Sequence, residues 1–120
     1  MKTPSDIRLS KDKKQLTITF DQVEYPMSSE FLRVYSPSAE VQGHGKGQEV
    51  LQLNKENVKI EQLKPTGNYA IAIHFSDSHS TGIYSWNYLQ HLAINHDQLW
   101  SEYRQKVNGK QNNNYHKVVV

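Results

Sequence analysis

The sequence predicts an α+β domain: a mostly antiparallel, bent β-sheet with a short helix after the first meander and a C-terminal helical segment packed on the sheet. Through the first third of the chain, apolar residues alternate with polar ones, which is the pattern of half-buried strands. After Ser85 the apolar spacing lengthens to that of a helix. At 120 residues the chain has the length of one domain, which we place at residues 5–107, with 108–120 as a flexible tail.

The first third of the chain is expected to be an antiparallel meander. Its three strands are predicted at residues 7–9, 16–20 and 23–27, where Leu, Ile, Phe, Tyr and Met occupy every second position. Asp21 and Gln22 are expected to form a tight turn between the second and third strands.

A short helix is expected over residues 30–35. Either Ser28 or Ser29 can cap it, and Pro37 stops it. Residues 38–49 are expected to be a loop, because three glycines alternate there and few apolar side chains are present.

The middle of the chain is expected to return to strands, at residues 58–63, 69–75 and 81–84, with a brief strand or turn at 50–53. A turn is predicted at Pro65-Thr66-Gly67-Asn68. Ala70 and Ala72 share one face of the second of these strands. Their small size suggests that another element, most simply a helix, packs closely against that face.

Two helices are expected at the C-terminal end. The first presents Trp86, Leu89 and Ala93 on one face. Asn95 followed by Gln98 resembles a capping box that begins the second helix, and Gly109 is expected to end it. The apolar stripe of the second helix comprises Leu99, Trp100, Tyr103 and Val107.

The composition excludes several classes of chemistry. The chain has no cysteine, which excludes disulfides, thiolate zinc sites and cysteine nucleophiles. No apolar run approaches the roughly 20 residues that span a bilayer, and the N-terminus has no signal-peptide pattern, so we expect a cytoplasmic protein. The net charge is only +2, and the cluster of Lys11, Lys13 and Lys14 is expected to be a solvated turn, which makes nucleic-acid binding unlikely.

The titratable residues form no recognisable catalytic or metal-binding pattern. His74 and His79 are five residues apart, as are His91 and His96, which on a helix places the two rings on different faces. Asp77 and His79 are too close along one turn to align with a serine as a catalytic triad. We expect Asp77 to shape its turn by bonding backbone N–H groups.

Two stretches of the chain together resemble a known family. The first is Phe31-Leu32-Arg33-Val34-Tyr35-Ser36-Pro37-Ser38-Ala39-Glu40-Val41, followed by Gly-His-Gly. The second runs from Tyr69 through Phe-Ser-Asp-Ser-His and Thr-Gly-Ile-Tyr-Ser-Trp to Leu89. Over about residues 5–105, the chain resembles the gamma-butyrobetaine hydroxylase-like N-terminal domain family.

The resemblance implies a metal site that this chain has lost. In eukaryotic members a structural zinc is bound by three cysteines and one histidine. Carried over by motif, these positions fall on Ser36, Ser38, Val41 and His79. Because hydroxyl and alkyl groups do not replace thiolates as zinc ligands, we expect no metal and no cofactor here. His79 is expected to be structural, tying the turn at 76–80 to the segment near Arg33 and Ser36.

The resemblance also bears on function. In hydroxylases of the family this domain precedes a separate iron- and 2-oxoglutarate-dependent catalytic domain, for which 120 residues leave no room. We therefore expect a non-catalytic accessory or protein-interaction module with an unidentified protein partner. The alternative is a metal-binding or dissociated subunit of an oxidoreductase or of an iron–sulfur scaffold system, since related domains occur fused to Mrp-type scaffold ATPases.

The candidate partner-binding edge comprises Arg33, Tyr35, His44 and Lys46, beside His79. Arginine and tyrosine are favoured anchors at interfaces, and long loops often carry function. The structural alternative is that Arg33 pairs with a nearby carboxylate and Tyr35 packs in the core.

Overall fold

The computed structural model describes residues 3–42, 50–77 and 82–114. Along the chain its elements are β1 (Asp6–Leu9), β2 (Gln15–Phe20), β3 (Val23–Ser28), α1 (Ser29–Val34), α2 (Ala39–Gln42), β4 (Ile60–Thr66), β5 (Ala70–Phe75), β6 (Gly82–Ser85), α3 (Trp86–Ile94) and α4 (His96–Asn114). The predicted α+β class is confirmed.

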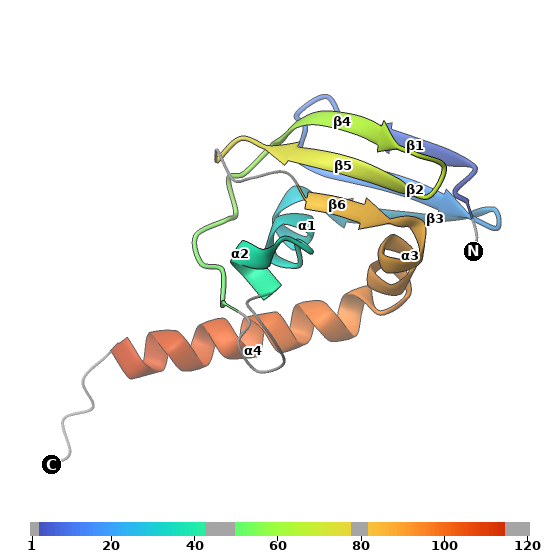
Figure 1. The fold of residues 1–120 in the computed structure, drawn as a ribbon. Helices are drawn as coiled ribbons and strands as arrows, with labels where there is room; N and C mark the ends of the chain where they lie inside the picture. The colour runs from blue at the N-terminus through green and yellow to red at the C-terminus, as the bar shows by residue number, and fades with distance from the viewer. Residues whose placement is uncertain (1–2, 43–49, 78–81, 115–120) are drawn as a thin grey trace, which may run out of the picture.

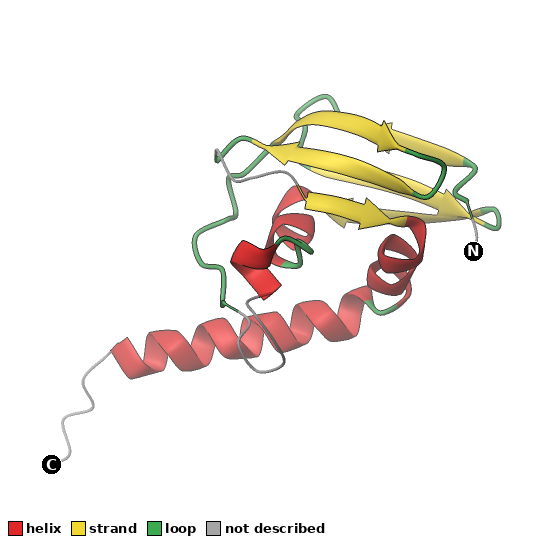
Figure 2. Ribbon diagram, viewed as in Figure 1, coloured by secondary structure: helices red, strands yellow, loops and turns green. Residues whose placement is uncertain are grey.

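The strands form two three-stranded antiparallel sheets, in the orders β1-β2-β3 and β4-β5-β6. The strands gather on one side of the molecule and the helices on the other (Figure 2). Helices α1 and α3 lie next to the sheets, while α4 runs across the outside and its C-terminal half projects beyond the other elements (Figure 1). The strand segments therefore divide into two sheets, where the sequence had indicated one bent sheet.

The predicted N-terminal meander is confirmed. Ile18 of β2 lies opposite Ile7 of β1 and Tyr25 of β3, so that each strand presents alternate side chains to the interior. Asp21 and Gln22 form the tight turn, and both have positive φ, as the hairpin turns that match strand twist require.

The second sheet differs from its predicted limits. β4 begins at Ile60 rather than at residue 58, contains a register irregularity between Ile60 and Gln62, and continues through Pro65 to Thr66. Pro65 is tolerated because β4 is an edge strand of its sheet. The turn consequently falls at residues 67–69, and residues 51–53 form no strand.

Strand β5 is buried on both faces, as the small alanines indicated. Ala70 and Ala72 are buried on one face, and Ile71 and Ile73 on the other. A single core joins both sheets to α1 and α3. Its largest fully buried side chains include Leu16, Ile18, Phe20, Met27, Phe31, Leu32, Ile60, Ile73, Tyr84, Leu89 and Leu92.

Three predictions about the helices need correction. The segment expected to be loop contains α2, and Val41 in it is buried. The prediction that Gly109 ends the last helix is wrong, because α4 continues to Asn114. The predicted tail 108–120 is thus helical as far as residue 114.

The predicted capping box is also wrong. The Asn95 side-chain amide donates to the carbonyl oxygen of His91 (2.9 Å), at the end of α3, and the amide of Gln98 donates to Glu102. The Asn95 side chain therefore caps the end of α3, while α4 begins at the next residue, as predicted, with the Asn95 carbonyl oxygen accepting from the backbone N–H of Leu99 (2.9 Å).

A matched pair of Gly→Ala substitutions tests the packing of β6 against the segment that follows α1. A Cβ at Gly82 would stand 2.8 Å from Oγ of the fully buried Ser36 and 2.9 Å from a ring carbon of Tyr84. We expect Gly82→Ala to lower the free energy of unfolding by about 1–3 kcal/mol, because the added methyl group overpacks the core.

Gly109→Ala is the control, since a Cβ there meets no atom within 4 Å and alanine favours the helix by about 0.5–1 kcal/mol. Urea denaturation of the two variants measures both effects. Equal stability of Gly82→Ala and the parent protein would contradict this packing.

Candidate binding groove

Helix α1 connects the sheets to the C-terminal helices. Its N-cap is Ser28, whose hydroxyl accepts a hydrogen bond from the backbone N–H of Phe31 (3.0 Å). Ser29 is the first residue of the helix and does not cap it. Its buried hydroxyl donates a hydrogen bond to the carbonyl oxygen of Val58. The hydroxyl of the fully buried Tyr84 donates to the carbonyl oxygen of Leu32. The backbone of this short helix is thus held from β6, and its first residue is tied to the segment before β4.

Arg33 joins α1 to the end of β5 by a buried ion pair. Its Nε lies 2.9 Å from Oδ2 of Asp77, and the same oxygen lies 3.0 Å from Nζ of Lys55. The side chain of Arg33 is only 5% exposed, so the interaction is poorly screened, and loss of the carboxylate would leave a buried charge. Asp77 was predicted to act locally on its turn; the structure adds these two long-range partners.

Tyr35, the residue after α1, braces both C-terminal helices. Its hydroxyl donates to the carbonyl oxygen of Leu99 in α4 (2.6 Å), and its own carbonyl oxygen accepts from the hydroxyl of Tyr88 in α3 (2.6 Å). A third phenol, Tyr103, donates to the carbonyl oxygen of Gln52 (2.5 Å). We call these three bonds the tyrosine brace.

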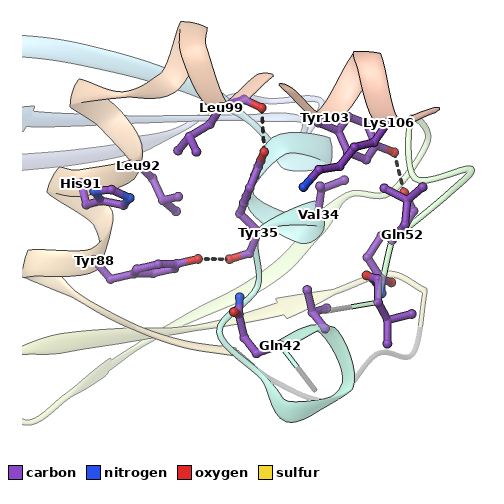
Figure 3. A pocket seen from close by; sticks show the side chains of 13 residues that line it. Val34, Tyr35, Gln42, Gln52, Tyr88, His91, Leu92, Leu99, Tyr103 and Lys106 are labelled. Carbon is purple, nitrogen blue, oxygen red and sulfur yellow. Dashed lines mark hydrogen bonds between the residues drawn. The ribbon is translucent and has the colours of Figure 1, made fainter. Parts of the chain in front are cut away.

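The tyrosine brace surrounds a groove of about 520 Å³ between α1, α2, α3, α4 and the segment before β4. Apolar walls come from Val34, Val41, Leu92 and Leu99, while His91 and Lys106 extend into the space from α3 and α4 (Figure 3). The remaining lining residues are Tyr35, Gln42, Val50, Leu51, Gln52, Tyr88 and Tyr103.

The phenols of the tyrosine brace remain protonated at neutral pH. Burial raises the pKa of Tyr88 to about 12, and the neighbouring Tyr35 phenol adds to the rise. Burial also raises the pKa values of Tyr35 and Tyr103. The negative charge of Glu102 raises the pKa of Tyr35 further. The charges of Glu30 and Glu56 raise the pKa of Tyr103 further. Each hydroxyl is therefore a hydrogen-bond donor and not a ready base.

The structure separates the residues predicted to form a partner-binding edge. Tyr35 lines the groove and is also partly buried against the core. Arg33 is buried and paired with Asp77, which is the structural alternative considered from sequence. His44, Lys46 and His79 lie outside the described residues, so their predicted roles stay predictions.

The family's zinc site does not fit the residues of this chain. Ser36 is fully buried, and its hydroxyl accepts a hydrogen bond from the backbone N–H of Ser38 (3.3 Å). Val41 is buried against the groove and has no donor atom. Two hydroxyls and an alkyl group do not replace three thiolates. Within the described residues, no group of three or more His, Asp or Glu side chains could hold a metal ion.

Sequence reasoning missed most of the groove. Two helices, α3 and α4, contribute Tyr88, His91, Tyr103 and Lys106 to the groove. The sequence indicated the apolar faces of both helices, but it did not indicate that they lie against α1. Tyr88 and Tyr35 are 53 residues apart, and Tyr103 and Gln52 are 51 apart. The signal that could have indicated the groove is the number of tyrosines, seven in 120 residues, because buried phenols require hydrogen-bond partners.

The described helices include none that is both long enough and apolar enough to cross a membrane. The basic segment at Lys11 to Lys14 is an exposed turn, as predicted, in which the Asp12 carboxylate accepts from Ser10 and from the backbone of Lys14.

Comparison with known proteins gives a consistent result. The family described as "Gamma-butyrobetaine hydroxylase-like, N-terminal" matches residues 7–90. Two NMR solution structures are similar, at 44% and 42% identity with TM-scores of 0.81 and 0.77; each match covers 92% of this chain, and 88% and 83% of the respective relatives.

A crystal structure of a protein of unknown function from Acidithiobacillus ferrooxidans, described as belonging to the DUF971 family, matches at 32% identity with a TM-score of 0.62. This match covers 75% of this chain and 91% of that one. No curated protein matches this chain.

The pKa of Tyr88 predicts how the tyrosine brace responds to alkali. Unfolding returns its phenol from a pKa of about 12 to one near 10.0, so above pH 10 the unfolded state binds fewer protons than the folded state. The stabilisation is complete below pH 10 and is lost as the pH rises toward 12. We expect Tyr88→Phe to cost about 1 kcal/mol at pH 7, and this deficit to shrink between pH 10 and 12. Chemical denaturation at several pH values measures the deficit. A deficit that stays constant up to pH 12 would contradict the burial of this phenol.

Proposed function

The chain belongs to the gamma-butyrobetaine hydroxylase-like N-terminal family, and from that premise we propose that it is a small non-catalytic interaction module whose binding surface is the groove at the tyrosine brace. The observation that carries the proposal is the groove itself. It offers about 520 Å³ of partly apolar space, while its phenols are already used in structural hydrogen bonds.

A non-catalytic role accords with the chemistry of the lining. The three phenols donate to backbone carbonyl oxygens, and burial keeps them protonated. His91 is exposed, and its Nδ1 lies 3.2 Å from the side-chain amide of Asn95. The described lining residues include no serine for His91 to activate and no Asp or Glu to orient its ring, so among them the nucleophile and the orienting group of a catalytic triad are missing.

A binding role accords with the exposure of apolar side chains at the rim. Val50 lines the groove and is 53% exposed. Tyrosines supply large rigid contact areas, and those of the tyrosine brace are fixed before any partner arrives, which lowers the entropic cost of binding. The ring of Tyr35 would thus contact a partner, while its hydroxyl keeps its hydrogen bond to Leu99 in α4.

The metal-binding alternative has less support. Its expected ligands are Asp77, His79 and His44. Asp77 is paired with Arg33 and Lys55, and the two histidines lie outside the described residues. At the family's zinc positions, Ser36 accepts a hydrogen bond and Val41 packs among apolar side chains. A role as a subunit of an oxidoreductase or of an iron–sulfur scaffold system would still need a docking surface, and the groove is the candidate for that surface too.

Two matched substitutions test the proposal. Val50 and Ile83 are exposed to nearly the same degree, 53% and 54%, but only Val50 lines the groove. We expect both Val50→Ser and Ile83→Ser to change the free energy of unfolding by less than about 0.5 kcal/mol. In affinity capture from the native cell extract with tagged protein, Val50→Ser should recover less of the partner, and Ile83→Ser should recover as much as the parent.

Equal recovery by all three proteins, or equal loss by both variants, would show that the groove is not the interaction surface. Mass spectrometry of the captured proteins identifies the partner in the same experiment.

A further inference from the structure

We propose that the groove recognises a peptide segment of a partner protein in which an apolar anchor stands beside a carboxylate. This inference rests on the proposed function and adds the chemistry of the partner. The apolar anchor would contact the walls formed by Val34, Leu92 and Leu99, and the carboxylate would pair with Lys106.

Lys106 is a cation available to a ligand. Its side chain extends into the groove (Figure 3), and within the described residues it makes no ion pair. Glu102 stands four residues before it on α4, the spacing at which an ion pair usually forms. The Glu102 carboxylate instead accepts from the amide of Gln98 (3.3 Å), on the preceding turn of the helix. The ammonium group is thereby left for a partner.

The charge of the lining favours an acidic ligand. Its ionisable cations are Lys106 and, when protonated, His91, and the described lining residues include no Asp or Glu. On α4, residues 103–109 include Arg104 and Lys106 and no acidic residue. Negative charges also lie nearby. Glu102 acts on Tyr35, and Glu30 and Glu56 act on Tyr103, while Arg104 acts on Glu30. The ligand carboxylate is therefore expected at Lys106 and away from Tyr103.

An open groove suits a chain that continues beyond it. Val50, His91 and Lys106 are all exposed, so one side of the groove faces solvent. A small free carboxylate would leave that side uncovered, whereas a peptide can place one side chain inside and continue across the rim. The rings of Tyr88 and His91 lie side by side at the groove, with centroids 6.3 Å apart and planes inclined by 24°, and offer aromatic contacts to such a segment.

Selection from a phage-displayed library of random linear dodecapeptides on the immobilised protein tests this inference. We expect selected peptides to share an Asp or Glu beside a large apolar residue. In fluorescence anisotropy with the synthetic peptides, Lys106→Gln should weaken binding about two- to fivefold, and Lys106→Arg should retain it. Lys64→Gln, which changes an exposed lysine on β4 outside the groove, is the control and should bind as the parent does.

Different failures have different meanings. If the selected peptides are neutral and bind the Lys106→Gln variant as tightly as the parent, the carboxylate preference is wrong. The proposal that the groove binds a partner would still stand. Binding of decanoate without any selected peptide would replace the peptide by a free small carboxylate. Tight, Lys106-dependent binding of a single-stranded oligonucleotide would replace it by a nucleic acid. A failed selection, together with Val50-dependent capture of a partner, would show that the groove recognises a folded surface and not a short segment.

Discussion

Two hydrogen bonds at Tyr35 join the residue after α1 to both C-terminal helices of this protein. Through its hydroxyl, Tyr35 holds the first turn of α4, and through its carbonyl oxygen it holds α3 by way of Tyr88. The ring of Phe31 adds contacts with His96 and Trp100 at the start of α4. Because α4 lies outside the two sheets, these contacts hold it against α1, and the bond from Tyr103 holds it to Gln52 in the segment before β4. The groove lies between these elements.

The position of Tyr35 depends in turn on α1, a six-residue helix that would be unstable alone. It is held by burial and by bonds to distant segments: Ser29 bonds Val58 in the segment before β4, Leu32 bonds Tyr84 in β6, and Arg33 bonds Asp77 in the turn after β5. In zinc-containing relatives a metal is expected to tie the segment after α1 to the turn after β5. In this chain the Arg33–Asp77 ion pair and the close approach of Gly82 to Ser36 join the segment after α1 and the end of α1 to the residues on either side of that turn.

The sequence was sufficient for features that depend on neighbouring residues. The alternation at Leu16 and Ile18 predicted the meander, and Ser28 was one of the two caps considered for α1. The sequence was misleading at residues that can play either of two structural roles. Gly109 can end a helix only in a left-handed conformation, but it sits inside α4, and Asn95 bonds backward to His91. The groove could not be predicted, because its walls come from segments about 50 residues apart whose contact is set by the tertiary fold.

The central claim is that the tyrosine brace fixes the groove before a partner binds. Amide hydrogen exchange, followed by NMR in the parent and in Tyr35→Phe, tests it most directly, because the substitution removes the bond to Leu99 and keeps the ring. The account predicts faster exchange in the first turns of α4, around residues 99–103, with unchanged protection in β2 and β5. Unchanged exchange in α4, or an equal increase throughout both sheets, would contradict it.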